Sequence, residues 1–375
     1  MKNNWQTLRK YFNLFLLLAL VTLIYGCCNM STRPKNETAP LKLVCEKISF
    51  PPDFPNPTAL EYFDGSLWVG TEQGLYRYKD GSWNQETKEN RFFDSDYVVA
   101  MDVNARTLWI SMDDGALSYD GNKYQRYFSS GKARSSIGVE NTAAVATAYG
   151  LVVTSVAGGG TERVHTSSAG LAYNEVNSVS MTSDGSFLAG TKAGVSLVKG
   201  SSIYTFKGPG LQPSGYSLIK VPASPPNCQL MSNNIKCSVP YLGKNAIGTT
   251  LGLTITDFQN YENYYGDYEE FAMENMQLVK VPMKGNSPIP GNSVTALATP
   301  PNGDVLFVGT NCGLGILKAD KTWQDTNIIP AYSPYAPVKD LTCNDDALWV
   351  LTGDGECYKI TGIQGLNSPK QSSDA

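Results

Sequence analysis

The stretch LWVGTEQGLYRYKDGSW, residues 67–83, constrains the fold most, because it contains two short strand-like runs around a tight turn and it recurs along the chain. Aromatic and β-branched residues in such runs are typical of strands. Gly74 suits a turn position that requires a positive φ. The counterparts of LWVGT (67–71) are LWISM (108–112), LVVTS (151–155), FLAGT (187–191), NAIGT (245–249), LFVGT (306–310) and LWVLT (348–352).

The spacing of these counterparts indicates the architecture. The position of Trp68 is occupied in turn by Trp68, Trp109, Val152, Leu188, Ala246, Phe307 and Trp349. Four intervals lie between 36 and 43 residues, and the two on either side of Ala246 are 58 and 61. A four-stranded propeller blade takes roughly 40–50 residues. We therefore expect an all-β chain forming a single β-propeller of seven four-stranded blades, with insertions at about 207–244 and 258–290. Six blades remain possible if the repeat at 151 or at 245 is misassigned.

A strand upstream of all repeats is expected to close the ring. The last repeat supplies only three strand candidates, at 338–342, 347–352 and 356–361, whereas LKLVCEKISF (41–50) precedes the first repeat. Pairing this segment with the last blade would remove an exposed sheet edge. The predicted propeller therefore spans 41–362, and 363–375 is a polar tail.

The pattern G-x-L-W-V/I-G-T-x-x-G-L-x-R-Y/F resembles the two-component regulator propeller repeat. It is matched closely at 65–78 and partly at 185–198, 303–317 and 348–360. The repeat at 151 departs most, with Gly158, Gly159 and Gly160 at the expected turn. The resemblance implies a propeller fold; it implies no single activity, because propellers have many functions.

The N-terminus is typical of a bacterial lipoprotein. Residues 1–26 combine a basic start with an apolar run too short to span a membrane comfortably, followed by Gly26 and Cys27. This resembles a lipobox, which implies a cleaved signal peptide and acylation, including palmitate, of Cys27. Residues 27–40 then form a flexible tether. Cys28, in place of Asp, favours the outer over the inner membrane of the envelope. An ordinary secretory signal and an anchor helix are the alternatives.

Charge limits the class of partner. The first 26 residues hold three of the 30 basic residues and none of the 34 acidic ones, so the remainder has a formal charge of −7. Without a basic cluster, a nucleic-acid partner is not expected. We expect a monomeric ring that binds a protein or a glycan.

Exported cysteines favour disulfides. Cys228 and Cys237 lie nine residues apart in one insertion and are predicted to pair. Cys45, Cys312, Cys343 and Cys357 allow three pairings, and Cys45 with Cys357 would fasten the closing strand if the register allows it. The chain has no CxxC spacing and one histidine, so no metal site and no cofactor are expected.

Catalytic residues are not recognisable. A Ser/His/Asp or Cys/His set requires an imidazole, and His165 lies in a polar segment that we interpret as an ordinary loop. The carboxylates that accompany the repeats, Asp94, Asp96, Asp102, Asp113, Asp114, Asp345, Asp346 and Asp354, are interpreted as turn formers.

The insertion FQNYENYYGDYEEF (258–271) is the candidate binding segment. Tyrosine offers a large contact area together with a hydroxyl group, which suits a protein partner or a sugar ring. The candidate residues are Tyr261, Tyr264, Tyr265 and Tyr268. Packing of these rings on their own blade is the alternative.

The leading hypothesis is a non-catalytic, membrane-anchored envelope lipoprotein that binds a partner through loops of one propeller face. A carbohydrate-sensing accessory protein, an envelope assembly factor, a toxin-immunity lipoprotein and a propeller hydrolase or lyase are the alternatives. The propeller face that binds remains open.

Overall fold

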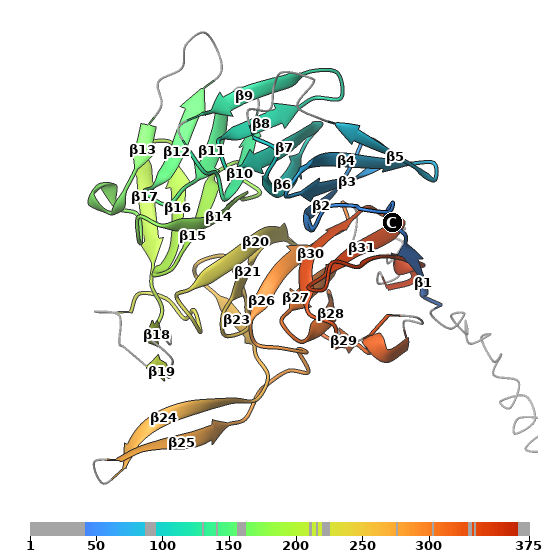
Figure 1. Cartoon of the computed structure of the whole chain (residues 1–375). Coiled ribbons are helices and arrows are strands. Elements are labelled where there is room, and N and C mark those ends of the chain that lie inside the picture. The colour runs from blue at the N-terminus through green and yellow to red at the C-terminus, as the bar shows by residue number, and fades with distance from the viewer. Residues whose placement is uncertain are drawn as a thin grey trace, which may run out of the picture. The chain divides into compact units, whose positions relative to one another are not determined.

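The computed structural model describes residues 42–86, 95–129, 131–139, 142–155, 163–209, 212–214, 217–219, 226–274, 277–301, 304–328, 332–333 and 335–366. Within this part of the chain, seven four-stranded antiparallel sheets form a closed ring (Figure 1). The first strand of each sheet contacts the first strand of the next, and β30 of the last blade contacts β2 of the first. The predicted seven-bladed propeller is therefore confirmed.

Blades 1 to 6 are each built from four consecutive strands in chain order. Blade 1 is β2 (Pro57–Phe63), β3 (Ser66–Thr71), β4 (Gly74–Lys79) and β5 (Ser82–Glu86). Blade 2 is β6 (Val98–Asn104), β7 (Thr107–Met112), β8 (Ala116–Tyr119) and β9 (Tyr124–Phe128). Blade 3 is β10 (Ser135–Val139), β11 (Thr142–Ala146), β12 (Leu151–Ser155) and β13 (Arg163–His165), and η2 (Ser167–Ala169) follows it. Blade 4 is β14 (Val176–Met181), β15 (Phe187–Thr191), β16 (Gly194–Lys199) and β17 (Ser202–Phe206).

Blade 7 is completed by the first strand of the described chain. Blade 5 is β20 (Ile235–Tyr241), β21 (Lys244–Thr249), β22 (Leu253–Thr256) and β23 (Tyr261–Tyr264). Blade 6 is β26 (Val294–Ala298), β27 (Val305–Thr310), β28 (Gly313–Lys318) and β29 (Trp323–Gln324), followed by η3 (Thr326–Ile328). Blade 7 is β30 (Val338–Cys343), β31 (Ala347–Thr352), β32 (Cys357–Thr361) and β1 (Val44–Ile48), which pairs antiparallel with β32. Closure by the N-terminal strand is confirmed.

The repeated glycine and threonine each have a structural reason. A Cβ atom on Gly70 would lie 2.5 Å from Val98 of the next blade, and one on Gly309 would lie 2.6 Å from Val338. The glycine therefore allows neighbouring blades to approach closely. The threonine closes the turn that follows, because Thr71 Oγ1 donates a hydrogen bond to the carbonyl of Gly74 at 2.8 Å.

The structure corrects the alignment of blade 3. The segment at 151–155 is its third strand, β12, and the second strand, β11, ends just before the repeated threonine. Thr147 Oγ1 donates to the carbonyl of Gly150 at 2.7 Å, as Thr71 does to that of Gly74. The true counterpart of LWVGT is therefore AAVAT (143–147), and Ala144 occupies the position of Trp68. The glycine run at 158–160 lies outside the described residues.

The insertions are shorter than predicted. Residues 235–244 belong to blade 5, so the first insertion ends before β20 and contains β18 (Gln212–Ser214) and β19 (Ser217–Ile219). The second insertion contains the hairpin of β24 (Tyr268–Glu274) and β25 (Gln277–Met283), a two-stranded sheet of its own (Figure 1). The predicted tail also starts later, because η4 (Ile363–Leu366) packs Ile363 and Leu366 into the protein.

Connections alternate between the two faces of the ring. In an antiparallel four-stranded blade, the first and third turns lie at one end of the strands. We refer to this end as the turn face; in blade 1 it carries Asp64-Gly65 and Asp80-Gly81. The second turns and the connections between blades lie at the other end, the insertion face, where both insertions leave the ring. Among the described residues, no helix has the length and apolarity needed to cross a membrane.

Candidate functional site

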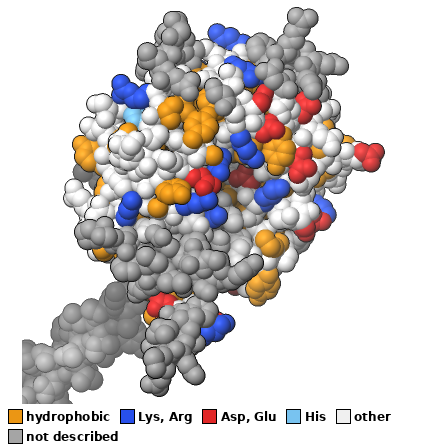
Figure 2. All heavy atoms as spheres, turned by 60° about the vertical axis from the view of Figure 1, so that its left-hand side comes forward, with side chains coloured by type: hydrophobic (Ala, Val, Ile, Leu, Met, Phe, Trp, Pro, Cys, Tyr) orange, Lys and Arg blue, Asp and Glu red, His pale blue; other side chains and the backbone are white. Residues whose placement is uncertain are grey.

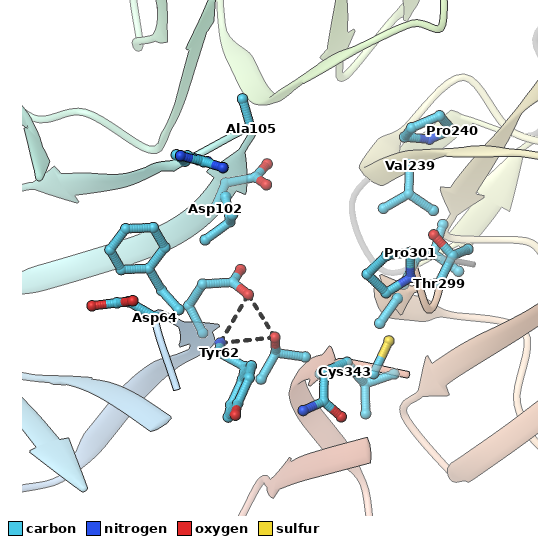
Figure 3. Close-up of a pocket in the computed structure, with 18 of the residues that line it drawn as sticks. Tyr62, Asp64, Asp102, Ala105, Val239, Pro240, Thr299, Pro301 and Cys343 are labelled. Atoms are coloured by element: carbon cyan, nitrogen blue, oxygen red, sulfur yellow. Dashed lines mark hydrogen bonds between the residues drawn. The ribbon is translucent and has the colours of Figure 1, made fainter. Parts of the chain in front are cut away.

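A cavity of about 780 Å³ opens at the centre of the turn face (Figure 3). The ends of the innermost strands β2, β6, β20, β26 and β30 line it, together with the turn between β8 and β9. Because these strands come from five blades, the cavity exists only once the ring is closed.

The lining follows from the strand register. In each blade one residue of the innermost strand lies directly opposite the residue in the position of Trp68. Around the ring these residues are Glu61, Asp102, Ile137, Ser180, Val239, Ala298 and Thr342. Carboxylates therefore occupy this position in blades 1 and 2, and apolar residues occupy it in blades 5 and 6.

The cavity has two chemically different walls. The acidic wall, from blades 1 and 2, carries Glu61, Asp64, Asp102 and Asp120, with Arg106 beside them. The apolar wall, from blades 5 and 6, carries Val239, Pro240, Leu297, Ala298 and Pro301. Figure 3 shows Asp64 and Asp102 across the opening from Val239, Pro240 and Pro301.

Hydrogen bonds across the junction of blades 7 and 1 fix Glu61. Thr342 Oγ1 donates to Glu61 Oε1 at 2.5 Å, and the backbone N–H of Tyr62 donates to the same oxygen at 3.0 Å. The N–H of Tyr62 is also 3.0 Å from Thr342 Oγ1. These three contacts form the triangle drawn in Figure 3 and hold the carboxylate at the cavity.

Asp340 fastens the same junction. Its Oδ2 accepts the backbone N–H of Leu60 at 2.8 Å, and its Oδ1 accepts that of Leu341 at 2.9 Å. Lys339 Nζ adds a hydrogen bond of 2.7 Å to the carbonyl of Pro57. Blade 7 is thus joined to blade 1 by side chains as well as by apolar packing.

Three carboxyl groups near the central cavity have raised pKa values. Burial, reinforced by the charge of Asp102, raises the pKa of Glu61 to about 8. Burial likewise raises the pKa values of Asp102 and Asp340 to about 7, and the charge of Asp340 adds to the rise at Asp102. Like charges close together in a poorly solvated site oppose ionisation. Near neutral pH these groups therefore share fewer than three negative charges, and a bound cation would favour their ionisation.

One side of the ring carries surface charges of both signs. Figure 2 shows acidic side chains interspersed with basic ones on the side of the ring that it presents. No group of three or more His, Cys, Asp or Glu residues within the described part of the chain is arranged to hold a metal ion.

The four predicted tyrosines do not line this cavity. Tyr261 and Tyr264 lie on β23, the outer strand of blade 5, and both are half-buried. Tyr265 and Tyr268 lie at the base of the β24–β25 hairpin, with ring centroids 5.9 Å apart. The structure therefore divides the four residues between a blade edge and a hairpin.

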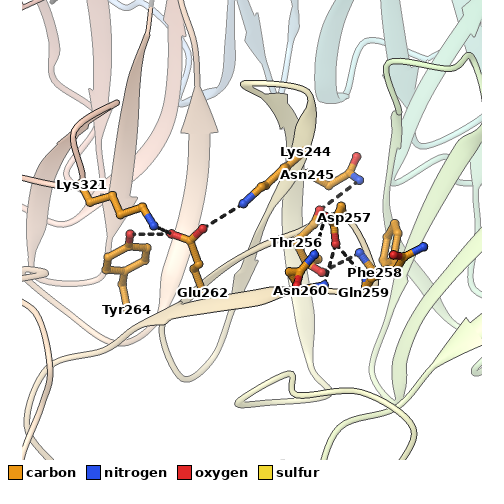
Figure 4. A network of polar contacts seen from close by, with 10 residues as sticks. All are labelled: Lys244, Asn245, Thr256, Asp257, Phe258, Gln259, Asn260, Glu262, Tyr264 and Lys321. Atoms are coloured by element: carbon orange, nitrogen blue, oxygen red, sulfur yellow. Dashed lines mark hydrogen bonds and ion pairs between the residues drawn. The ribbon is translucent and has the colours of Figure 1, made fainter.

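Tyr264 belongs to a polar network at the edge of the ring (Figure 4). Its hydroxyl donates to Glu262 Oε2 at 3.4 Å, and Glu262 also pairs with Lys244 and Lys321, each at 2.9 Å. The two ammonium groups lower the pKa of Glu262. This network joins strands β21 and β23 of blade 5 to the turn between β28 and β29 of blade 6, and it has a structural role.

The predicted disulfides are not formed: Cys45, Cys228, Cys237 and Cys357 are free thiols. Cys45 lies opposite Ile360 and Cys357 opposite Ile48, so the two cysteines point to opposite faces of the sheet. Cys228 and Cys237 pack in separate hydrophobic clusters. Cys27, the predicted lipidation site, lies outside the described residues.

His165 is a buried residue of β13, opposite Leu151, and not the loop residue expected. Burial and the charge of Arg163 lower its pKa, and it does not line the cavity. The prediction overlooked Glu61, and it interpreted Asp102 as a turn former although Asp102 belongs to β6. One sequence signal could have identified both residues: Glu61 and Asp102 each lie seven residues before a tryptophan of the repeat.

Comparisons with known proteins support the fold. No family model matches the chain, and no match is found among curated proteins. The extracellular domain of a hybrid two component system, BT3049 from B. thetaiotaomicron, matches with a TM-score of 0.55 and 15% identity. The match covers 82% of this chain but only 40% of that one.

Two further solved structures match over nearly their full length. Virginiamycin B lyase from Staphylococcus aureus, with quinupristin, has a TM-score of 0.58 and 10% identity over 85% of this chain and 99% of that one. YCF48 bound to D1 peptide has a TM-score of 0.53 and 12% identity over 84% and 96%. At these identities the likeness shows a shared propeller fold and leaves function open.

Proposed function

We propose that this chain is a non-catalytic, lipid-anchored propeller of the bacterial envelope that binds a basic segment of a partner protein in its central cavity. The observation that carries this proposal is the pairing of an acidic wall with an apolar wall across one cavity. Lysine and arginine side chains have an apolar stem and a cationic head. One such side chain can place its stem along Val239 and Leu297 and its head beside Glu61 and Asp102.

Electrostatics favours this occupant over a neutral one. Burial raises the pKa values of Glu61 and Asp102, because a negative charge in the cavity is unfavourable without a counterion. A cation that enters offsets this cost and releases protons from the carboxyl groups. Affinity for a basic ligand should therefore rise as the pH is raised from about 6 to about 8.

The anchor and the fold are consistent with this role. The lipobox-like Cys27 would tether the ring to a membrane through residues 27–40, and the neighbour YCF48 is a propeller bound to a peptide. An envelope assembly factor or a toxin-immunity lipoprotein would use such a site. Carbohydrate sensing is the second candidate: it is suggested by the resemblance to the two-component regulator propeller repeat, and extracellular domains of two component systems share the fold.

The test compares matched charge removals on the two faces. The full chain is purified from solubilised envelopes as wild type, as the double variant Glu61→Gln and Asp102→Asn, and as a control with Glu269→Gln and Glu270→Gln in the hairpin. Binding is measured with a capped alanine pentapeptide that has a central lysine and with the same peptide carrying norleucine. We expect the cavity variant to lose lysine-peptide affinity by more than about tenfold, and the control to retain it.

The pH dependence of the wild type provides a measurement that needs no variant. Tighter binding of the lysine peptide at about pH 8 than at about pH 6 supports the proposal. Equal affinity for the lysine and norleucine peptides would contradict it. Selective binding of a neutral oligosaccharide, unchanged between these pH values, would favour the carbohydrate-sensing role instead.

A further inference from the structure

Arg106 is the one basic residue among the described residues that line the central cavity. It follows Ala105 in the two-residue turn between β6 and β7, and Figure 3 shows Ala105 on the same side of the opening as Asp102. Arg106 is exposed, and the ion pairs found within the described part of the chain do not include it. An exposed cation that belongs to the protein itself therefore lies beside the acidic wall.

A second hollow, of about 570 Å³, lies beside the same turn, between blades 2 and 3. We refer to it as the outer hollow; it is lined by Asn104, Ala105, Arg106, Thr107, Trp109, Ser118, Asp120, Lys123, Gln125, Tyr127, Gly138 and Val139. Ala105, Arg106 and Asp120 line both this hollow and the central cavity. Rotation of the Arg106 side chain can therefore place its guanidinium in either site.

The backbone around Arg106 is fixed by hydrogen bonds. Asn104 Nδ2 donates to the carbonyl of Gly138 in blade 3 at 2.8 Å, which holds the base of the turn. Asp120 Oδ1 accepts two backbone N–H groups of its own turn, each at 2.9 Å. These hydrogen bonds lower the pKa of Asp120, so its carboxylate is ionised beside both sites. Only the side chain of Arg106 has to move between them.

A comparison of three blades shows what is unusual about blade 2. In blades 1 and 7 the third strand places a cation directly opposite the repeated tryptophan, at 5.5 Å and 5.8 Å from the centre of its ring: Arg77 opposite Trp68 and Lys359 opposite Trp349. In blade 2 the buried Ser118 lies opposite Trp109. The third strand of blade 2 therefore supplies no cation at this position, and the outer hollow lies there instead.

The outer hollow offers a guanidinium two favourable contacts. Tyr127, whose ring centroid is 4.8 Å from that of Trp109, is half-buried in its wall, and aromatic rings attract cations. The carboxylate of Asp120 is the second contact. Lys123, the other cation of the hollow, is exposed and can extend into water.

We propose, building on the function proposed above, that Arg106 determines how tightly the cavity holds a basic ligand by competing with it for the acidic wall. Two cations at the same wall repel each other, so a lysine or arginine of the partner has to displace the guanidinium. The outer hollow takes up Arg106 when the partner binds. The cavity thus carries its own competitor, and the outer hollow sets the cost of displacing it.

Matched charge removals on the full chain test the competition. Arg106→Gln should tighten binding of the lysine pentapeptide by about twofold to fivefold, the range for a partly exposed charge pair, and leave the norleucine peptide unchanged. Lys123→Gln removes an exposed cation that lines the outer hollow only, and it should change the affinity much less. Equal effects of the two variants would show that the general positive charge of this face opposes binding, and would overturn the role of Arg106.

A double-mutant cycle tests the outer hollow. Gln125 is half-buried on β9, directly opposite Ser118, and Gln125→Glu adds a carboxylate there with little change in shape. This carboxylate should draw Arg106 out of the cavity and raise lysine-peptide affinity by about twofold to fivefold. The rise should be absent when Arg106→Gln is also present. An equal rise in both backgrounds would show that the new carboxylate attracts the peptide directly, and the outer hollow would then have no part in the exchange.

The outcomes separate this inference from the proposed function. If Glu61→Gln with Asp102→Asn loses the lysine peptide while Arg106→Gln leaves its affinity unchanged, the function stands and the competition is wrong. If neither the wild type nor Arg106→Gln prefers the lysine peptide to the norleucine peptide, the proposed function fails and the competition fails with it. Weaker lysine-peptide binding by Arg106→Gln would show that Arg106 contacts the ligand favourably, which also overturns the competition.

Discussion

The two faces of the ring differ in two respects. The insertion face has segments that are easily recognised in the sequence, whereas the turn face has side chains that form hydrogen bonds between blades. The insertion face carries the β24–β25 hairpin, a two-stranded sheet that belongs to no blade. The turn face carries short turns and single residues within repeats, yet it holds the central cavity. The unusual composition of residues 258–271 therefore marked the outer edge of blade 5 and the base of the hairpin. The cavity is instead built from residue differences at one repeated position of the innermost strands.

The polar contacts of the two faces also differ in how much they stabilise the ring. Glu61, Asp340 and Thr342 hold blade 1 to blade 7 through hydrogen bonds to each other and to backbone groups. Asp267 at the base of the hairpin pairs with the exposed Lys284 and accepts the N–H of Gly285. Matched changes on the two faces should therefore differ in effect.

The largest difference is expected between Asp340→Ala and Asp267→Ala. Asp340→Ala leaves the N–H groups of Leu60 and Leu341 without acceptors inside the ring, which should lower the free energy of unfolding by about 2–4 kcal/mol. Asp267→Ala removes an exposed pair and should cost less than about 1 kcal/mol. Urea unfolding followed by tryptophan fluorescence measures both. Equal costs would contradict the division between the faces.

The sequence predicted the ring and its closure because both depend on local repetition. The spacing of the LWVGT-like motif predicted seven blades. The missing fourth strand of the last repeat predicted that residues 41–50 lie beside the last blade, and β1 does so. Blade 3 was misaligned by one strand because Ala143 and Ala144 replace the leucine and tryptophan. Only the turn from Thr147 to Gly150 retains the pattern there.

The cavity could not be predicted because it depends on register between strands and on neighbours distant in the chain. Nothing in the sequence distinguishes Asp102 from other aspartates. Its position opposite Trp109 in the strand register places it in the central cavity, where its charge acts on Glu61. The Cys45–Cys357 pairing failed for the same reason: the strands pair as predicted, and an offset of three residues puts the thiols on opposite faces.

A moderate effect is expected on the pH dependence of stability. The pKa values of Glu61, Asp102 and Asp340 are raised in the folded protein, so it retains protons that the unfolded chain releases above about pH 4. Their stabilising contribution is complete below that pH and is lost as the pH rises through about 7 to 8. The free energy of unfolding should therefore fall as the pH is raised from about 5 to about 8.

Other groups define the controls for this measurement. The charge of Lys339 opposes the rise in the pKa of Asp340, and the hydrogen bond from Thr342 opposes the rise in the pKa of Glu61. The lowered pKa of His165 acts with the opposite sign, so His165→Gln should steepen the decline slightly. Glu61→Gln with Asp102→Asn should flatten it, and Glu269→Gln with Glu270→Gln should not. A decline that persists in the cavity variant would show that other groups cause it.

The smallest effect is expected from removing the hairpin, and it tests the comparison most directly. The backbones of Gly266 and Gly285 lie side by side, since a Cβ on Gly285 would be 2.4 Å from the carbonyl carbon of Gly266, so residues 267–284 can be excised by joining these glycines. The hydrogen bond from Asn286 N to the Tyr265 carbonyl, at 2.9 Å, lies outside the excised segment. We expect the free energy of unfolding to change by less than about 1 kcal/mol and lysine-peptide affinity to stay the same. If the excision abolishes partner capture from solubilised envelopes while peptide binding persists, Tyr268 and the hairpin form a separate binding site, and the cavity alone does not account for recognition.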